Sequence, residues 1–281
     1  MSYLGIEFGS TRIKAVLIDD GFKIISSGDY TWKSSYQNGI WTYDLKEALK
    51  GLKIALSTIK DTKNIQSVGI SGMMHGYLAF DKDWNLLTPF RTWQNTITAE
   101  SAKQLTENFG FNIPQRWSIA HLYQAILNGE EHIKKIAHIT TLAGYIHYML
   151  TGVNVVGIGE ASGIFPIDSE NLCYNAEMLE KFNSLISKFG LPFSAESVLP
   201  KVLVAGQNAG SLTEKGAELT DNLLNIGIPF APPDTISDVP VGRYFSKSSI
   251  VKPREPITAT FIFILLFVLL IGHIFDKYSI H

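Results

Sequence analysis

The chain has 281 residues, of which 46% are hydrophobic and 18% charged, and its formal net charge is −2. It is long enough to bury a sizeable core in one large or two modest domains, and the charge balance gives no indication of a nucleic-acid partner. The single cysteine, Cys173, excludes an internal disulfide and is typical of a reducing compartment. A cytoplasmic location without a signal peptide is therefore expected.

The N-terminal segment predicts two short strands, 3–8 and 13–19, joined by the small-residue turn 9–11. Gly9 accepts unusual dihedral angles, and the amides and hydroxyls of such a turn can bind phosphate oxygens. Glu7 falls on the strand face opposite the apolar residues, where a carboxylate could hold Mg²⁺ through water. The alternative is an ordinary hairpin without a ligand.

Apolar residues recur at helical spacing over 45–59 and predict a helix there. Asp44 can cap this helix, with Glu47 in the capping-box position. Because strands precede and follow the helix, the first part of the chain indicates an α/β sheet. The further strands are expected at 22–31, 67–72 and 76–81.

Residues 98–150 are predicted to be mostly helical, and residues 175–188 show a further amphipathic pattern. Strands or loops are expected around 153–167 and 198–213. The expected helix boundaries are the capping residues Thr98 and Asn175 and the glycine stops Gly110, Gly152 and Gly190.

Two short segments carry side chains suited to binding a small polar ligand. Met74 and His75 lie in a glycine-flanked turn between two strands, at the end of the sheet where α/β proteins commonly bind ligands. Trp93, Gln94 and Asn95 combine an aromatic plane with two amides, a set suited to a sugar or polyol. The alternatives are a hairpin with a partly buried histidine and a buried tryptophan with polar neighbours.

The remaining candidates give weaker indications. Glu160 and Ser162 lie in a small-residue turn before an apolar stretch and could contact a ligand, although a plain connecting turn is the simpler reading. The histidines show no metal-ligand spacing, and His147 is expected to be a packed or surface residue.

The C-terminal part departs from this pattern. Residues 234–256 have the Pro- and Ser-rich composition of a linker. Residues 257–275 are apolar and about long enough to form a transmembrane helix, so contact with a membrane is one expectation. A β-rich core segment is the alternative, because Phe, Ile and Val favour strands.

Five segments occur in an order and spacing that resemble the N-terminal half of the FGGY carbohydrate kinases, nearest to their xylulokinase-like members. They are GIEFGSTRIKAVLID (5–19), VGISGMMHGYLAFD (68–81), TPFRTWQNT (88–96), GIGEASGIFPID (157–168) and LPKVLVAGQNAGSLTEKGAEL (199–219). The resemblance implies an α/β fold of the actin-like, ribonuclease-H-like ATPase type over residues 1–233. It also implies that the second domain of the family is missing.

The resemblance assigns roles to the candidate residues. It implies ATP and Mg²⁺ as cofactors and a small-molecule sugar as substrate. The family usually has Asp at the position of Glu7 and an Asp near the tryptophan, where this chain has Asn95. The implied substrate contacts are Met74, His75, Trp93, Gln94 and Asn95, the phosphate contacts are Gly9, Ser10, Thr11 and Arg12, and the metal contact is Glu7.

The catalytic residue stays unassigned. After residues 227–233 the family has a Gly-Asp-rich loop that supplies the general base, and this chain lacks its glycines. Asp234 and Asp238 lie close by, but the role is transferred to neither. The sequence therefore predicts a truncated carbohydrate kinase whose inherited reaction is ATP-dependent phosphorylation of a ketopentose such as xylulose. The alternative is a non-catalytic sugar-binding or membrane-tethered pseudoenzyme.

Overall fold

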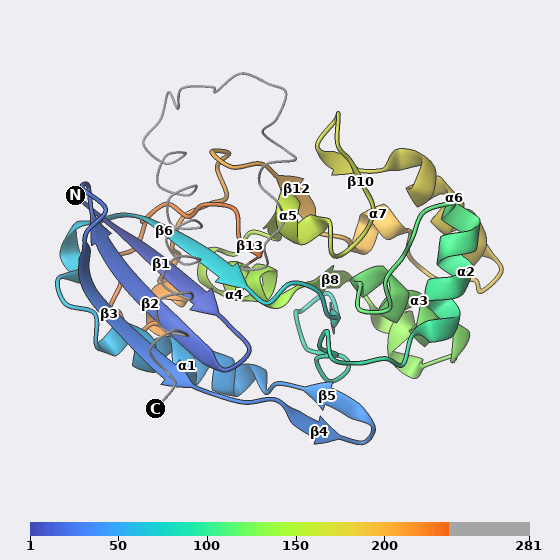
Figure 1. The fold of residues 1–281 in the computed structure, drawn as a ribbon, viewed down its shortest axis with the longest axis horizontal. Helices are drawn as coiled ribbons and strands as arrows, with labels where there is room; N and C mark the ends of the chain where they lie inside the picture. Colours follow the sequence, from blue (N-terminus) through green and yellow to red (C-terminus); the bar gives the residue numbers. More distant parts are fainter. Residues whose placement is uncertain (236–281) are drawn as a thin grey trace, which may run out of the picture.

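A computed structural model describes residues 1–235 of the chain (Figure 1). Within this part, no helix is both long enough and apolar enough to cross a membrane. The predicted apolar segment 257–275 lies outside the described residues, as does the predicted linker apart from its first two residues. Those two, Asp234 and Thr235, form a short strand.

A five-stranded mixed sheet forms the N-terminal side of the molecule, in the order β13-β6-β1-β2-β3. β1 and β2 form the predicted antiparallel hairpin, and β3 continues it on the outer edge. β6 and β13 run parallel to β1 on the other side, so the hairpin lies directly beside β6. The strands are β1 (Ser2–Phe8), β2 (Arg12–Asp19), β3 (Ile24–Thr31), β6 (Ile65–Gly72) and β13 (Asp234–Thr235).

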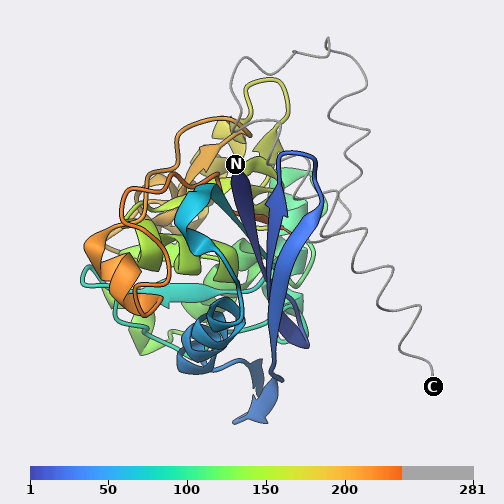
Figure 2. The same cartoon turned by 90° about the vertical axis from the view of Figure 1, so that its left-hand side faces the viewer.

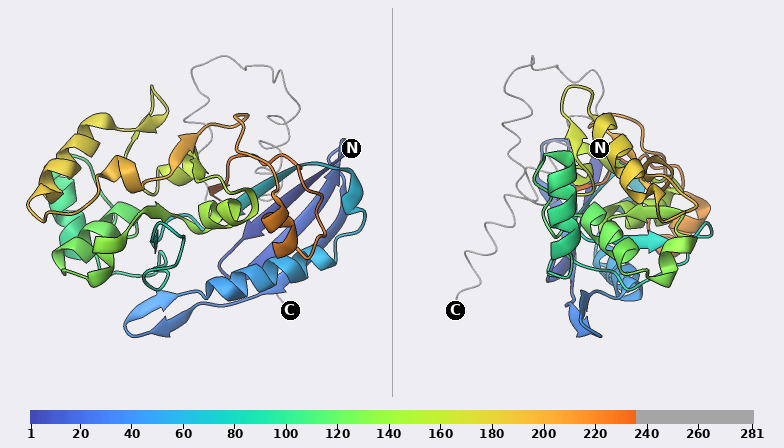
Figure 3. Two further views of the ribbon diagram at one scale, coloured as in Figure 1. Left: turned by 180° about the vertical axis from the view of Figure 1, so that it is seen from behind. Right: turned by 90° about the vertical axis from the view of Figure 1, so that its right-hand side faces the viewer.

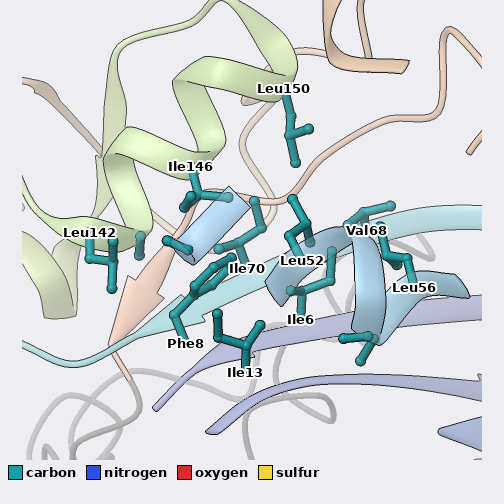
Figure 4. Packing of buried hydrophobic residues seen from close by; sticks show 14 of the residues in the cluster. Ile6, Phe8, Ile13, Leu52, Leu56, Val68, Ile70, Leu142, Ile146 and Leu150 are labelled. Carbon is teal, nitrogen blue, oxygen red and sulfur yellow. The ribbon is translucent and has the colours of Figure 1, made fainter. Parts of the chain in front are cut away.

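The main core lies between one face of this sheet and the helices α1 (Leu45–Ser57) and α4 (Leu142–Thr151). Both helices lie on the same side of the strands (Figures 2 and 3), and α8 (Glu214–Leu219) packs on α4. Alternate strand residues point into this layer, as the strand period of two requires. The close view shows Ile6, Phe8, Ile13 and Ile70 of the sheet against Leu52, Leu56, Leu142, Ile146 and Leu150 of the helices (Figure 4).

The cap of α1 is confirmed only in part. The side chain of Asp44 accepts a hydrogen bond from the Lys46 amide at 2.8 Å. The predicted capping box is not formed, because Glu47 instead accepts hydrogen bonds from the Tyr30 hydroxyl at 3.0 Å and from Lys50 at 2.8 Å. Tyr30 on β3 thus binds the Glu47 carboxylate, which the local pattern predicted to cap the N-terminus of the helix.

A second core occupies the other end of the molecule, at the right of Figure 1. Gly110 and Gly152 end α2 and α4 in the left-handed conformation, as predicted, and Asn175 caps α6 by accepting from the Met178 amide at 3.0 Å. Thr98 precedes α2, but its hydroxyl donates to the Gln115 carbonyl oxygen instead of capping the helix. The helices of this core are α2 (Ala99–Phe109), α3 (Ser118–Leu127), α6 (Ala176–Ser187) and α7 (Ala195–Val198).

Short elements connect the two cores and correct two readings of the sequence. Residues 71–81 are not a hairpin, because β6 belongs to the central sheet while β7 pairs with β8. The predicted turn at 159–163 overlaps a single-turn helix, α5 (Ile158–Ala161). The remaining two-stranded pairs are β4 (Ser35–Gln37) with β5 (Ile40–Thr42), β7 (Leu78–Phe80) with β8 (His138–Thr140), β9 (Val155–Gly157) with β12 (Lys201–Leu203), and β10 (Ile167–Asp168) with β11 (Cys173–Tyr174).

Candidate functional site

Three parallel strands end at the same edge of the central sheet. Phe8, the last residue of β1, is paired with Gly72, the last residue of β6, and Gly72 is paired with Thr235 of β13. The Met73 amide donates to the Phe8 carbonyl oxygen at 3.0 Å, which keeps the chain after β6 beside the turn after β1. The predicted phosphate turn and the Met74–His75 segment are therefore neighbours in space.

Two aromatic side chains bind the backbone of the turn between β1 and β2. The Trp32 indole N–H donates to the Gly9 carbonyl oxygen, and the Tyr43 hydroxyl donates to the Ser10 carbonyl oxygen, both at 2.7 Å. The Trp32 amide donates to the Thr11 carbonyl oxygen at 3.1 Å. Ser10 and Thr11 themselves are exposed. The scaffold thus engages the carbonyl oxygens and leaves the hydroxyl groups of the turn at the surface, an arrangement suited to an anion.

Glu7 lies beside this turn in a partly buried position. Its Oε1 atom lies so near Gly9 that a Cβ atom there would be 2.9 Å from it, and it is 3.5 Å from Lys14 Nζ on the neighbouring strand. Burial raises the pKa of Glu7, while the Lys14 charge opposes that shift. One carboxylate beside a phosphate turn fits the usual protein share of Mg²⁺ ligation, in which water and phosphate supply most of the oxygens.

Met74 and His75 pack against the segment that follows α5. A Cβ atom on Gly163 would lie 2.6 Å from His75 Nδ1 and 3.1 Å from the methyl group of Met74, so a glycine is needed for this close approach. His75 has the left-handed φ of 71°, which turns the chain sharply at the end of β6. Burial, together with the nearby Arg116 charge, lowers the pKa of His75 to about 4, so the imidazole is neutral at pH 7.

The tryptophan segment joins this region through a pair of backbone hydrogen bonds. Tyr77 and Arg91 exchange their amides and carbonyl oxygens at 2.8 and 3.1 Å, which brings the chain beyond Arg91 alongside the chain before Tyr77. Trp93 is 45% exposed, and the Gln94 Oε1 atom is buried without a partner in the described part of the chain. Both residues therefore have groups free for a ligand.

Asn95 is placed differently from its neighbours. It is 3% exposed, and its amide group makes hydrogen bonds in both directions with the backbone of Trp41 on β5. Its Oδ1 accepts from the Trp41 amide, its Nδ2 donates to the Trp41 carbonyl oxygen, and both distances are 2.8 Å. A second bond from Nδ2 reaches the Thr92 carbonyl oxygen at 3.0 Å. Asn95 therefore fixes the segment that carries Trp93.

Two carboxyl groups lie beside β13: Glu160 is fully buried and Asp234 is partly buried. Asp234 Oδ1 accepts hydrogen bonds from the amides of Glu160 at 2.7 Å and of Thr235 at 2.8 Å. Burial raises the pKa of Asp234 to about 6, although these amides oppose the shift. Burial also raises the pKa of Glu160, and the charge of Asp234 adds to that effect. In this arrangement Asp234 holds the start of α5 against the sheet.

Two histidines away from the strand ends, His147 and His121, serve packing. His147 is fully buried, and its Nε2 atom lies 2.8 Å from the Ala209 carbonyl oxygen, which confirms it as a packed residue. His121 is fully buried and stacks on the Tyr77 ring. Within residues 1–235 no group of three or more metal-ligating side chains is found.

Sequence reasoning missed two residues of this region, Gln115 and Arg116. The Gly76 amide donates to the Arg116 carbonyl oxygen at 3.2 Å, and the Gln115 Oε1 atom is buried without a partner in the described part of the chain. These residues lie on the loop before α3, far in sequence from the other candidates. No local pattern indicates their position, because it depends on the packing of α3 against the Gly76 turn.

Comparison with known proteins identifies the family of this fold. The sequence profile of the "FGGY family of carbohydrate kinases, N-terminal domain" matches residues 2–235. The chain belongs to the FGGY family of carbohydrate kinases. The matched residues coincide with the described part of the structure, so the sheet, both cores and the candidate site all belong to this FGGY domain.

Individual FGGY relatives agree with this assignment. The xylulose kinase of Staphylococcus xylosus is 22% identical over 235 residues, which are 76% of this chain and 45% of the relative. The glycerol kinase of Thermococcus gammatolerans is 23% identical over 236 residues, which are 77% of this chain and 46% of the relative. The crystal structure of xylulose kinase from Rhodospirillum rubrum superposes with a TM-score of 0.72 at 18% identity, covering 84% of this chain and 50% of that chain. The chain thus spans about half the length of these relatives, and the structural match shows the fold.

Proposed function

We propose that the FGGY domain of this chain binds a ketopentose or a related polyol at the edge where β1, β6 and β13 end. The observation that carries this proposal is the meeting of the three strand ends, which sets the turn after Phe8 beside the segment after Gly72. Ligands of α/β sheets commonly bind at such carboxyl ends. The relatives named as xylulose and glycerol kinases support a sugar or polyol as the ligand class.

Three side chains would contact the sugar, and a fourth would hold their segment in place. The neutral imidazole of His75 can exchange a hydrogen bond with a sugar hydroxyl, and the exposed face of Trp93 can stack on C–H groups. Gln94 supplies a buried carbonyl oxygen that has no donor among residues 1–235. Asn95 would act indirectly, because its hydrogen bonds to Trp41 hold the segment that carries Trp93 and Gln94.

The turn after β1 at this edge suits a nucleotide phosphate. Ser10 and Thr11 are exposed on this turn, and Glu7 could contribute one oxygen ligand to Mg²⁺. Arg12, the first residue of β2, is also exposed and pairs with Asp29 at 3.5 Å. When bound, ATP supplies the phosphoryl group, and Mg²⁺ neutralises charge on its phosphates. We propose that this chain contributes the sugar and phosphate contacts of such a transfer, and that transfer also requires an ATP-binding half of the kind present in the longer relatives.

Calorimetric titration of the purified 281-residue chain with D-xylulose tests the binding proposal. His75→Asn removes the imidazole but keeps a residue type that tolerates a left-handed φ. Loss of a ligand hydrogen bond costs about 0.5–1.5 kcal/mol, so affinity should fall roughly two- to tenfold. Lys103→Gln, on the exposed surface of α2, is the matched control and should bind as the unmodified chain does. Equal affinity of the His75→Asn variant would contradict the assignment.

A further inference from the structure

The segment that carries Trp93 and Gln94 is held at both ends. Asn95 holds the far end through hydrogen bonds to the backbone of β5. At the near end, Arg91 exchanges backbone hydrogen bonds with Tyr77 at 2.8 and 3.1 Å. Arg91 is only 3% exposed, so a guanidinium charge is buried two residues before the exposed ring of Trp93. A buried charge needs a partner, and the group that compensates it helps to fix the near end of the segment.

Glu130 compensates the charge of Arg91. The Arg91 Nη2 atom donates to Glu130 Oε2 and lies 3.5 Å from the Thr88 hydroxyl oxygen. Among residues 1–235, Glu130 is the one carboxylate in ion-pair contact with Arg91, and the Nε and Nη1 atoms of the arginine have no hydrogen-bond partner there. Burial acts to raise the pKa of Glu130, but the hydrogen bond and charge of Arg91 lower it on balance, so the carboxylate is ionised at pH 7.

The same carboxylate is connected to Tyr77 through His132. Glu130 Oε2 lies 3.4 Å from His132 Nδ1, and His132 Nε2 lies 2.9 Å from the Tyr77 hydroxyl oxygen. Burial lowers the pKa of His132 against the opposing charge of Glu130, so the imidazole is neutral at pH 7. Because an ionised carboxylate only accepts hydrogen bonds, this contact favours the tautomer with the proton on Nδ1, in which Nε2 accepts from the tyrosine. Tyr77 and Arg91 are therefore linked through their side chains as well as their backbones.

This closed network lies between the two groups of proposed sugar contacts. Tyr77 follows His75 by two residues, and Arg91 precedes Trp93 by two residues. The guanidinium lies over the Tyr77 ring, 5.4 Å from its centroid, and Glu130 leads directly into the 3₁₀ helix η2 (Glu131–Lys135). A displacement of Arg91 would therefore move Trp93 relative to His75.

We infer that Glu130 is a positioning residue of the proposed sugar site, which acts through Arg91 to fix Trp93. The inference rests on the proposed function and adds to it a residue that does not itself touch the ligand. Removal of one partner of a buried ion pair leaves the other charge uncompensated. Without the carboxylate, the guanidinium would move toward water and the segment beyond Arg91 would move with it.

Calorimetric titration with D-xylulose of the full chain and its Glu130→Gln variant tests the inference. The variant keeps the size of the side chain and loses its charge. Its affinity should fall roughly two- to tenfold, the range for one lost ligand hydrogen bond. Glu130→Asp retains the charge on a shorter side chain and should have an intermediate affinity. Glu177→Gln, which removes the exposed ion pair with Lys181 on α6, is the matched control and should bind as the unmodified chain does.

Coupling to Trp93 separates positioning from a general loss of stability. Trp93→Ala should weaken binding, and Glu130→Gln added to it should weaken binding by less than about twofold further, because the ring that it positions is absent. Thermal unfolding establishes that each variant is folded at the titration temperature, and Glu130→Asp serves for the same comparison if Glu130→Gln does not fold.

Three outcomes separate the inference from the proposed function. Unchanged affinity of the folded Glu130 variants would overturn the inference and leave sugar binding intact. An equal fall in affinity with and without the Trp93 ring would also overturn it, because such additivity indicates a structural role alone. Failure of the unmodified chain to bind D-xylulose would overturn the proposed function together with the inference.

Discussion

Asn95 connects the tryptophan segment to the β4–β5 hairpin through a single amide group. One of its polar atoms accepts from the Trp41 amide and the other donates to the Trp41 carbonyl oxygen. An ionised carboxylate, which only accepts hydrogen bonds, could satisfy just the Trp41 amide. Asn95, which resembles a substrate contact in the sequence, therefore has a structural role: it holds the segment that carries Trp93.

This geometry predicts the outcome of replacing the Asn95 amide by a carboxylate. Asn95→Asp should destabilise the chain by about 1–3 kcal/mol, because a carboxylate oxygen would face the Trp41 carbonyl oxygen and a buried acceptor would lose its donor. Urea unfolding at pH 8 measures the effect. Asn108→Asp is a control substitution of the same type near the end of α2, and its stability should change little. An Asn95→Asp variant as stable as the parent would contradict the structural role.

Because of Asp234, the free energy of unfolding should decrease as pH rises. Burial raises the pKa of Asp234 from 3.8 to about 6, so between these pH values the folded chain keeps a proton that the unfolded chain releases. The stabilisation is complete below about pH 4 and is lost as pH rises through 6. At 1.36 kcal/mol per pKa unit, the loss amounts to about 3 kcal/mol. Glu160, whose pKa is also raised, contributes in the same direction.

Asp234→Asn should remove its share of this dependence. An asparagine Oδ1 can still accept from the amides of Glu160 and Thr235, but the residue does not ionise. Thermal unfolding from pH 4 to pH 8 should show a smaller loss of stability for the variant than for the parent. Parallel stability profiles for the two proteins would show that Asp234 does not titrate in this range.

Among the elements, α1 and β3 approach each other closely at Gly28. A Cβ atom there would overlap the Ala55 carbonyl oxygen of α1 and the hydroxyl of Thr58, which ends the helix. Gly28→Ala should therefore push the helix away from the sheet and cost about 1–3 kcal/mol, the usual cost of overpacking. Denaturant midpoints check this expectation. Gly21→Ala is the control, because its nearest neighbour would be the flexible Asp19 side chain at 3.3 Å, and its midpoint should be close to that of the parent.

At this scale the sequence predicted what local patterns can determine. The hairpin of β1 and β2, the strand β6 and the helix α1 follow from alternation and helical spacing, and all are present. The pairing of β7 with β8 and the recruitment of Glu47 by Tyr30 depend on contacts between distant segments. The same holds for Arg116, whose place beside Gly76 is set by α3 and not by any motif.

For the whole molecule, the FGGY match covers a first domain, while phosphoryl transfer depends on positioning two substrates between domains. We expect the purified 281-residue chain alone to show no sugar-dependent ADP release above background in a coupled assay. No described residue is assigned as the general base, and loss of such a base typically costs 10²–10⁴-fold. Addition of glycerol kinase with glycerol to the same assay verifies its sensitivity. Clear ketopentose-dependent ADP release by the chain would contradict the prediction.

The meeting of Phe8, Gly72 and Thr235 at one sheet edge has a consequence for the order in which the protein acquires its site. Contacts between residues so far apart in sequence form late, because a long loop must close before they stabilise the chain. During synthesis the hairpin and β6 can pair early, but the edge stays incomplete until the ribosome has released β13. A nascent chain therefore presents the hairpin, β6, α1 and α4 for packing before its ligand edge can be completed.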